Sequence, residues 1–221
     1  MANPEFILLG DSHATAIGLA AREAGLAFAG GPLASGRDFY VPFCEDAGGK
    51  LRFLDGEMEA LHAELCAEVA AQTLLHSNLP ILCTVGSGFH VAATTALWSD
   101  FISPDGQLDA GFIESALFAE ICDEMFDPAM QFYRMLREAG CAVQVALPPQ
   151  RCPETSDAPI MIAFQARAQA RLHELGCGII DTRATTAPDG TQDPAFCKAA
   201  DPVHGNVAFG AEILRAAGYL A

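Results

Sequence analysis

Basic residues are scarce in this sequence. Its 221 residues include 12 Lys and Arg against 28 Asp and Glu, which gives a formal net charge of −16 at pH 7. Surfaces that bind nucleic acids or anionic membranes carry clustered Lys and Arg. We therefore expect neither a nucleic-acid partner nor a membrane partner, and we expect a substrate that is neutral or cationic.

Long apolar runs are also missing. No stretch approaches the roughly 18 consecutive apolar residues of a membrane-spanning helix. Residues 1–5 show no basic region followed by an apolar one, as a signal peptide would. These two absences predict a cytoplasmic protein.

Cysteine pairs with metal-ligand spacing are absent. The eight cysteines are scattered and none forms a CxxC, so the sequence predicts no metal site. Cys83 and Cys141 lie in apolar surroundings. In an intracellular chain of this size, this pattern favours reduced, buried thiols over a disulfide framework.

The chain has no long polar or Pro/Ser-rich linker and no repeat of fixed period. Apolar residues make up 51% of it, which is enough for a sizeable core. Residues 1–221 are therefore predicted to form a single domain.

Short apolar runs alternate with helical patterns. Strands are predicted over residues 6–9, 26–29, 81–85, 141–147 and 178–181, and helices over residues 13–24, 56–76, 112–139, 159–175 and 207–217. Pro128 is expected to start a second segment of the longest helix. We expect a small hairpin or irregular chain at residues 39–53, and a candidate flap that includes the Ser-Pro-Asp-Gly turn at residues 103–106. The alternation predicts an α/β fold, a three-layer sandwich whose sheet has about five strands, mainly parallel, with helices on both faces.

The first strand ends in Gly10-Asp11-Ser12-His13, directly before the first helix. This context places Ser12 at the carboxyl end of a buried strand, where open α/β sheets bind their ligands. It also places Ser12 at a helix N-terminus, which stabilises negative charge. Ser12 is a candidate nucleophile, and the competing interpretation is that it only caps the helix.

A second pair of reactive side chains lies near the C-terminus, in Asp201-Pro202-Val203-His204. Nucleophilic serine catalysis needs an imidazole to take the hydroxyl proton and an acid to orient that imidazole. The spacing lets the Asp201 carboxylate reach Nδ1 of His204 and leaves Nε2 free to face a serine. Capping of the last helix is the alternative role for Asp201.

These two blocks, in this order, resemble the SGNH (GDSL-like) hydrolase superfamily. Gly10-Asp11-Ser12-His13 is similar to the first block of the family, whose serine is the nucleophile, and Asp201-x-x-His204 is similar to its last block. His13 replaces the leucine of the first block, as in a sub-branch that contains carbohydrate O-acyl esterases and acyltransferases. The resemblance implies an SGNH/flavodoxin-like fold and a triad of Ser12, His204 and Asp201.

The resemblance also implies two further oxyanion donors. The first is a glycine after the second strand, for which Gly36 is the best match and Gly31 the second choice. The second is an asparagine after the third strand, and here Gly88 stands in its place. One side-chain amide donor of the family is therefore missing.

Four groups remain open as replacements for that amide. They are the backbone N–H of Gly88, the hydroxyl of Ser87, the imidazole of His90 and the side chain of Asn206. Loss of one oxyanion donor typically costs about 10²–10³ in rate, so the identity of the replacement bears directly on activity.

Taken together, the motifs predict a serine esterase or acyl hydrolase that cleaves a small acyl ester and needs no cofactor. The resemblance implies that the ester is a small molecule or a carbohydrate, and that an acetyl group is one acyl candidate. Two alternatives stay open. One is a weakened or inactive binding module with the same fold, which the glycine at position 88 motivates. The other is an O-acyltransferase with an identical triad.

Overall fold

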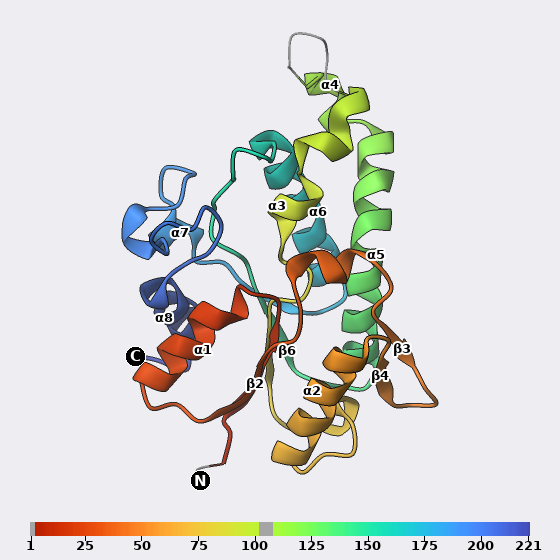
Figure 1. Cartoon of the computed structure of the whole chain (residues 1–221), viewed down its shortest axis with the longest axis vertical. Helices are drawn as coiled ribbons and strands as arrows, with labels where there is room; N and C mark the ends of the chain where they lie inside the picture. Colours follow the sequence, from red (N-terminus) through yellow and green to blue (C-terminus); the bar gives the residue numbers. More distant parts are fainter. Residues whose placement is uncertain (1–2, 102–107) are drawn as a thin grey trace.

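A parallel sheet lies between two layers of helices in the computed structural model of the chain, which describes residues 3–101 and 108–221 (Figure 1). The sheet has the strand order β2-β1-β5-β6-β7. Its strands are β1 (Phe6–Gly10), β2 (Phe28–Pro32), β5 (Ile81–Cys83), β6 (Val143–Ala146) and β7 (Gly178–Ile180). Every neighbouring pair is parallel. The predicted fold class is confirmed, with a sheet of five strands.

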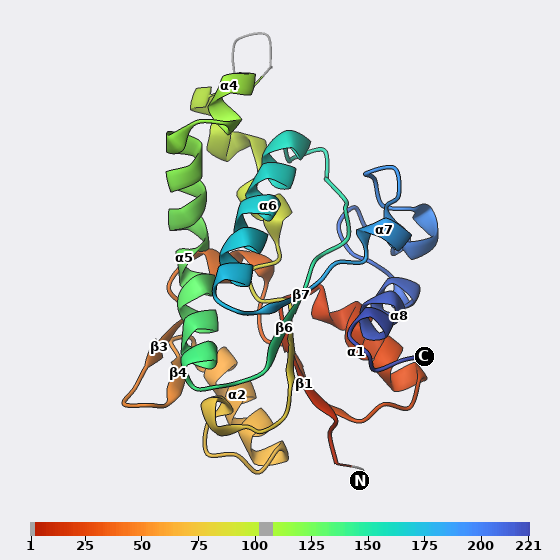
Figure 2. The same ribbon diagram turned by 180° about the vertical axis from the view of Figure 1, so that it is seen from behind.

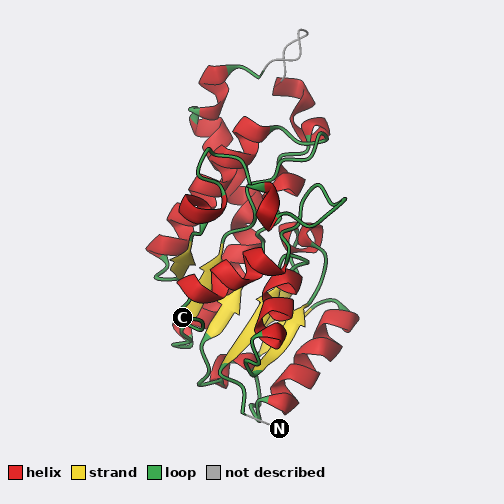
Figure 3. Cartoon of the chain, turned by 90° about the vertical axis from the view of Figure 1, so that its left-hand side faces the viewer, coloured by secondary structure: helices red, strands yellow, loops and turns green. Residues whose placement is uncertain are grey.

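Helices cover both faces of this sheet, as Figures 1 and 2 show from opposite sides. One face is covered by α1 (Ala14–Glu23) and α8 (Val207–Ala216). The other is covered by α2 (Gly56–Glu68), α5 (Ala116–Glu138) and α6 (Ala158–Glu174). The strands lie side by side beneath the helices in Figure 3.

Alternation of side chains along β1 explains why both faces are covered. Phe6 and Leu8 enter the core beneath α1 and α8, whereas Ile7 and Leu9 enter the larger core beneath α2, α5 and α6. Successive residues of a strand point to opposite faces, so a continuously apolar strand needs helices on both sides. The apolar run at residues 6–9 therefore accounts for a sheet with a layer of helices on each face.

The remaining elements are short. An antiparallel hairpin is formed by β3 (Cys44–Asp46) and β4 (Leu51–Phe53), within the segment where a small hairpin was one expectation. The short α-helices are α3 (Phe89–Ala92), α4 (Ala110–Ile113) and α7 (Arg183–Thr186). The 3₁₀ turns are η1 (Gly36–Tyr40), η2 (Leu74–His76), η3 (Thr95–Phe101) and η4 (Pro194–Phe196). The turn predicted at residues 103–106 lies outside the described residues.

Two predicted helix boundaries are wrong. The helix expected over residues 56–76 ends as α2 at Glu68, because Ala70 adopts a left-handed conformation with φ of 53° and turns the chain. Pro128 does not start a new segment, since α5 continues through it. Phe126, Ala129 and Met130 are buried on both sides of the proline. Their packing holds the two halves of α5 on one core despite the missing backbone hydrogen bond.

The packing of α1 against α8 joins the two ends of the chain. Gly210 of α8 lies directly against the backbone of α1, because an added Cβ would stand only 2.1 Å from the Ala16 carbonyl oxygen. The turn before α1 holds Ser12, and the loop before α8 holds His204. This close contact between helices therefore brings together two residues that are far apart in the sequence.

Over the described ranges, no helix is both long enough and apolar enough to cross a membrane. All eight cysteines are free thiols, and six of them are buried. Burial raises the pKa of the Cys83 thiol to about 12.

Candidate active site

The site lies at the carboxyl edge of the sheet, next to the end of β1. The chain goes from β1 to β2 on one side of it, and β5 lies on the other side. The order β2-β1-β5-β6-β7 is that of flavodoxin-like sheets, whose ligands bind outside the strand ends at the switch between the first and third strands. Ser12 follows β1, Gly36 follows β2, and Gly88 follows β5. Three loops from neighbouring strands therefore meet at one edge.

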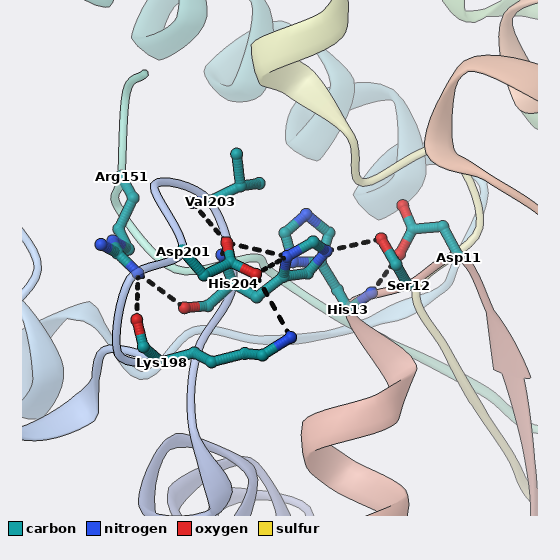
Figure 4. A network of polar contacts seen from close by, with 8 residues as sticks. All are labelled: Asp11, Ser12, His13, Arg151, Lys198, Asp201, Val203 and His204. Carbon is teal, nitrogen blue, oxygen red and sulfur yellow. Dashed lines mark hydrogen bonds and ion pairs between the residues drawn. The ribbon is translucent and has the colours of Figure 1, made fainter. Parts of the chain in front are cut away.

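Ser12 and His204 are in hydrogen-bond contact. Ser12 Oγ lies 2.7 Å from His204 Nε2, and Figure 4 shows the two side chains facing each other. The residue that caps α1 is His13, with no side-chain cap bond. The Ser12 hydroxyl is thus directed at the imidazole.

Asp201 lies on the other side of the same imidazole. Its Oδ2 is 2.8 Å from His204 Nδ1, and its Oδ1 also accepts hydrogen bonds from the backbone amides of Val203 and His204 (Figure 4). Asn206, and not Asp201, caps α8. An Nδ1–H that donates to Asp201 leaves Nε2 as the acceptor for the serine proton.

The charge of Asp201 is stabilised by its surroundings. Burial alone would raise the pKa of this carboxyl, but hydrogen bonds from the amides of His204 and Val203 and from the His204 ring hold it well below its ordinary value. Lys198 Nζ adds a cation 3.3 Å from Asp201 Oδ2. Asp201 is therefore ionised at neutral pH and can stabilise a protonated His204.

Arg151 contacts the backbone of the loop that carries Asp201 and His204. Its guanidinium Nη1 donates to the carbonyl oxygens of His204, at 2.8 Å, and of Lys198, at 3.3 Å (Figure 4). The structure thus gives Arg151 a role in holding the loop that carries Lys198 and His204. No sequence signal pointed to it, because the acceptors are main-chain atoms of a distant loop.

Asp11 is a buried carboxyl next to the serine. Its Oδ1 accepts from the His13 amide at 2.9 Å and from the Thr84 hydroxyl at 3.1 Å. Burial raises the pKa of Asp11 to about 7, against the opposing effect of these hydrogen bonds. The first bond fixes the turn that presents Ser12, and the second ties β1 to the end of β5.

The backbone amides of Ser12, Gly36 and Gly88 are free donors. In the part of the chain that the structure describes, none of the three makes a hydrogen bond to protein. Gly36 and Gly88 also touch, since a Cβ added at Gly88 would lie 3.3 Å from Gly36 Cα. The two loops approach so closely that a side chain at position 88 would crowd Gly36, which gives a steric reason for the missing asparagine.

Three other groups that the sequence offered as oxyanion donors make contacts elsewhere in the protein. Ser87 is buried, and its hydroxyl donates to the Ala146 carbonyl at 3.4 Å. Asn206 uses both ends of its amide, accepting from the Phe209 amide and donating to the Ala195 carbonyl. Gly31 lies within β2, paired with Leu9. These three are engaged elsewhere, which leaves the Gly88 amide and His90.

His90 and His13 form a pair of imidazoles beside His204. The ring of His13 lies 5.1 Å from that of His204 and 6.0 Å from that of His90, between centroids. Burial, followed by the neighbouring imidazoles, lowers the pKa of His13 to about 3 and that of His90 to about 4. Both rings are therefore neutral at pH 7, and each carries one N–H donor at the site.

No group of three or more His, Cys, Asp or Glu side chains in the described ranges is arranged to hold a metal ion. The polar groups assembled here are a hydroxyl, an imidazole, a carboxylate and free amides. Such a set suits proton transfer and stabilisation of a developing oxyanion.

The fold that surrounds this site is the SGNH (GDSL-like) hydrolase fold. It is shared with a GDSL-like lipase from Bacteroides thetaiotaomicron, at a TM-score of 0.52 and 15% identity, over 98% of this chain and 88% of that one. It is also shared with an extracellular lipase from Streptomyces rimosus, at a TM-score of 0.51 and 14% identity, over 99% of this chain and 100% of that one. At these identities the likeness is one of fold.

Sequence comparison finds no further relative of this chain. The sequence matches no family model, and a search of curated proteins finds no match. What this chain does must therefore be argued from its own side chains.

Proposed function

We propose that this chain is an ester hydrolase with a serine nucleophile. The observation that carries the proposal is the contact of 2.7 Å between Ser12 Oγ and His204 Nε2, with the opposite nitrogen of the same ring 2.8 Å from Asp201 Oδ2. A hydroxyl, a base and an orienting acid in this order activate a serine for attack on a carbonyl carbon. Neighbours of the same fold are lipases, which supports the proposal by analogy.

In the first half of the reaction, Ser12 Oγ attacks the ester carbonyl carbon while His204 Nε2 takes the hydroxyl proton. The tetrahedral intermediate collapses, the bond to the leaving alcohol oxygen breaks, and His204 returns the proton to that oxygen. Asp201 keeps Nδ1 protonated throughout and stabilises the imidazolium. An acyl-Ser12 ester and a free alcohol result.

In the second half, water takes the place of the alcohol. His204 removes one of its protons, the hydroxide attacks the acyl carbon, and the proton passes to Ser12 Oγ as the acyl bond breaks. The products are a carboxylic acid and the regenerated hydroxyl. Transfer of the acyl group to another alcohol would follow the same steps with that alcohol in place of water.

Three backbone amides are the proposed oxyanion donors. Those of Ser12, Gly36 and Gly88 are free and come from the three loops that meet at the site. The positive end of the α1 dipole adds to their field, since Ser12 immediately precedes that helix. On this proposal the Gly88 amide takes over from the asparagine side chain, with the neutral His90 as a further donor.

The direct test is hydrolysis of a nitrophenyl butyrate ester by the purified chain and by Ser12→Ala. We expect clear turnover by the wild type and a loss of at least about 10⁴-fold in kcat for the variant. Ser99→Ala, at an exposed serine of η3, is the matched control and should hydrolyse as the wild type does. Equal activity of Ser12→Ala would overturn the proposal.

The second candidate is a binding module that keeps the fold without the chemistry, and Gly88 is the observation that favours it. The same assay separates the two. A folded wild type that hydrolyses no ester, yet is protected from thermal unfolding by a nonhydrolysable ester analogue, would support the binding module.

A further inference from the structure

A cavity of about 300 Å³ opens directly beside Ser12 and His204. Its apolar lining comes from Ala16 and Leu19 of α1, from Val207 and Phe209 of α8, and from Pro149. The cavity thus extends from Ser12 on the side of α1 and α8, and the loops that carry Gly36 and Gly88 do not line it.

Most of the cavity surface is apolar, although six of the lining side chains are polar. Four of these six already contact other protein groups, namely Ser12, His204, Lys198 and Asn206, which leaves His13 and Thr15. Asn206 bonds to the Phe209 amide and the Ala195 carbonyl, and Lys198 Nζ lies 3.3 Å from Asp201 Oδ2. A sugar in this space would lose hydration from its hydroxyls and gain few hydrogen bonds in return, which is unfavourable. A hydrocarbon group would lose no hydrogen bonds.

Leu19 adds exposed apolar surface to this cavity. It lies on α1 at the edge of the cavity and is 42% exposed, so part of an apolar side chain faces water. Covering apolar surface gains roughly 25 cal/mol per Å². A hydrocarbon group that enters the cavity would pack against Leu19 and remove that surface from water.

Size fits the same ligand class. Ligand cavities commonly span about 300–1,000 Å³, so this space is at the lower end of the range and still larger than an acetyl group requires. Ser12 and His204, the residues that would carry out ester cleavage, line this cavity.

We propose that this cavity binds the hydrocarbon part of the substrate, and that the preferred substrates are esters with an apolar group of several carbons rather than acetate esters of sugars. The inference rests on the proposed ester hydrolysis. The hydrocarbon is either the acyl chain or the alcohol, and the two are separated by experiment.

Two series of esters provide the test. In the acyl series, kcat/KM is measured for nitrophenyl acetate, butyrate, hexanoate and octanoate. In the alcohol series, it is measured for methyl, butyl, hexyl and octyl acetates. We expect kcat/KM to rise by about tenfold or more from the shortest ester to the six-carbon one in one of the series, since each methylene bound in an apolar pocket strengthens transition-state binding.

The series in which kcat/KM rises identifies the part of the ester in the cavity. Flat or falling values in both series, with acetates still hydrolysed, would overturn the cavity assignment and leave the hydrolase intact. No hydrolysis of any ester by folded protein would overturn the hydrolase and the cavity assignment together.

A variant ties the preference to this cavity. Leu19→Lys places a charge at its edge, and we expect the ratio of kcat/KM for hexanoate over acetate, or for hexyl over methyl acetate, to fall at least about fivefold. Leu117→Lys is the matched control, because Leu117 is a leucine of α5 that is 50% exposed, and the ratio should not change. An unchanged ratio in Leu19→Lys would contradict the assignment.

Discussion

Arg151 holds the main chain around the acid and the base, although it touches neither reactive atom. Its two hydrogen bonds end on the carbonyls of Lys198 and His204, on either side of Asp201. Hydrogen bonds from a charged donor contribute about 1.5–3 kcal/mol. Both hydrogen bonds come from the single nitrogen Nη1, whose N–H groups are held in the guanidinium plane.

We predict that Arg151→Ala lowers kcat about tenfold with little change in KM, because His204 loses its fixed position relative to Ser12. Arg151→Lys should recover part of the loss, since one acceptor can still be reached. Arg134→Ala, at an exposed arginine of α5, is the control and should keep wild-type kcat. If Arg151→Ala lowers only the melting temperature and leaves kcat unchanged, the positioning role is wrong.

Asp11 makes stability depend on pH in an unusual direction. Burial raises the pKa of this carboxyl to about 7 in the folded chain, while the unfolded value stays near 3.8. Between these two pH values the folded state holds a proton that the unfolded state has lost. Stability from this group therefore decreases as pH rises from about 4 to about 7 and is constant above.

Asp11→Asn removes that titration and keeps the oxygen that accepts from His13 and Thr84. We predict that the free energy of unfolding of the wild type, relative to this variant, falls with rising pH over that window, by about 4 kcal/mol at most. Urea denaturation at several pH values measures it. A difference that is constant or rises with pH would contradict the assignment of a raised pKa.

At the scale of elements, the loops after β2 and β5 meet at Gly36 and Gly88. A Cβ added at Gly88 would lie 3.3 Å from Gly36 Cα, so the close approach of the two loops disfavours a side chain at position 88. The loop after β1 presents the serine, and the α1–α8 contact presents the histidine. The site is thus assembled by the packing of connections, not by any single segment.

Introducing at position 88 the asparagine that the SGNH resemblance implies should therefore harm this protein. We predict that Gly88→Asn lowers kcat/KM about tenfold or more, since its Cβ would contact Gly36 Cα at 3.3 Å and displace both amides from the oxyanion position. Gly56→Asn, at the open start of α2, is the control and should have wild-type activity. A higher kcat/KM in Gly88→Asn would show that a side-chain amide, and not the Gly88 backbone, is the missing donor.

At the scale of the whole molecule, the sequence predicted the alternation of strands and helices well. Continuous apolar runs such as residues 6–9 specify strands that need cover on both faces, and the parallel order follows from the helices between them. It did not predict the end of α2, because Ala70 carries no glycine-like signal for its left-handed turn. The sequence also predicted an interruption of the helix at Pro128, as local rules for proline indicate. The helix continues in the structure because residues on both sides of the proline are buried in the core.

The sequence predicted the site residues that stand in short motifs. It did not predict those whose role depends on contacts with main-chain atoms far away in the sequence. Ser12, Asp201 and His204 stand in two recognisable blocks, and their roles stay predictions until activity is measured. The contacts of Arg151 and of Gly88 depend on main-chain atoms brought together only by folding. The single-domain organisation and the cytoplasmic location also stay predictions.

The central claim is that His204 activates Ser12 as a nucleophile, and covalent labelling tests it most directly. A fluorophosphonate probe reacts with activated serines, so we predict one phosphonyl adduct per chain, located on Ser12 by peptide mass spectrometry. In His204→Gln the adduct should form at least about a hundredfold more slowly, because the base is lost. Absence of an adduct in folded wild type, an adduct on another serine, or labelling of Ser12 at the same rate without His204 would contradict the account.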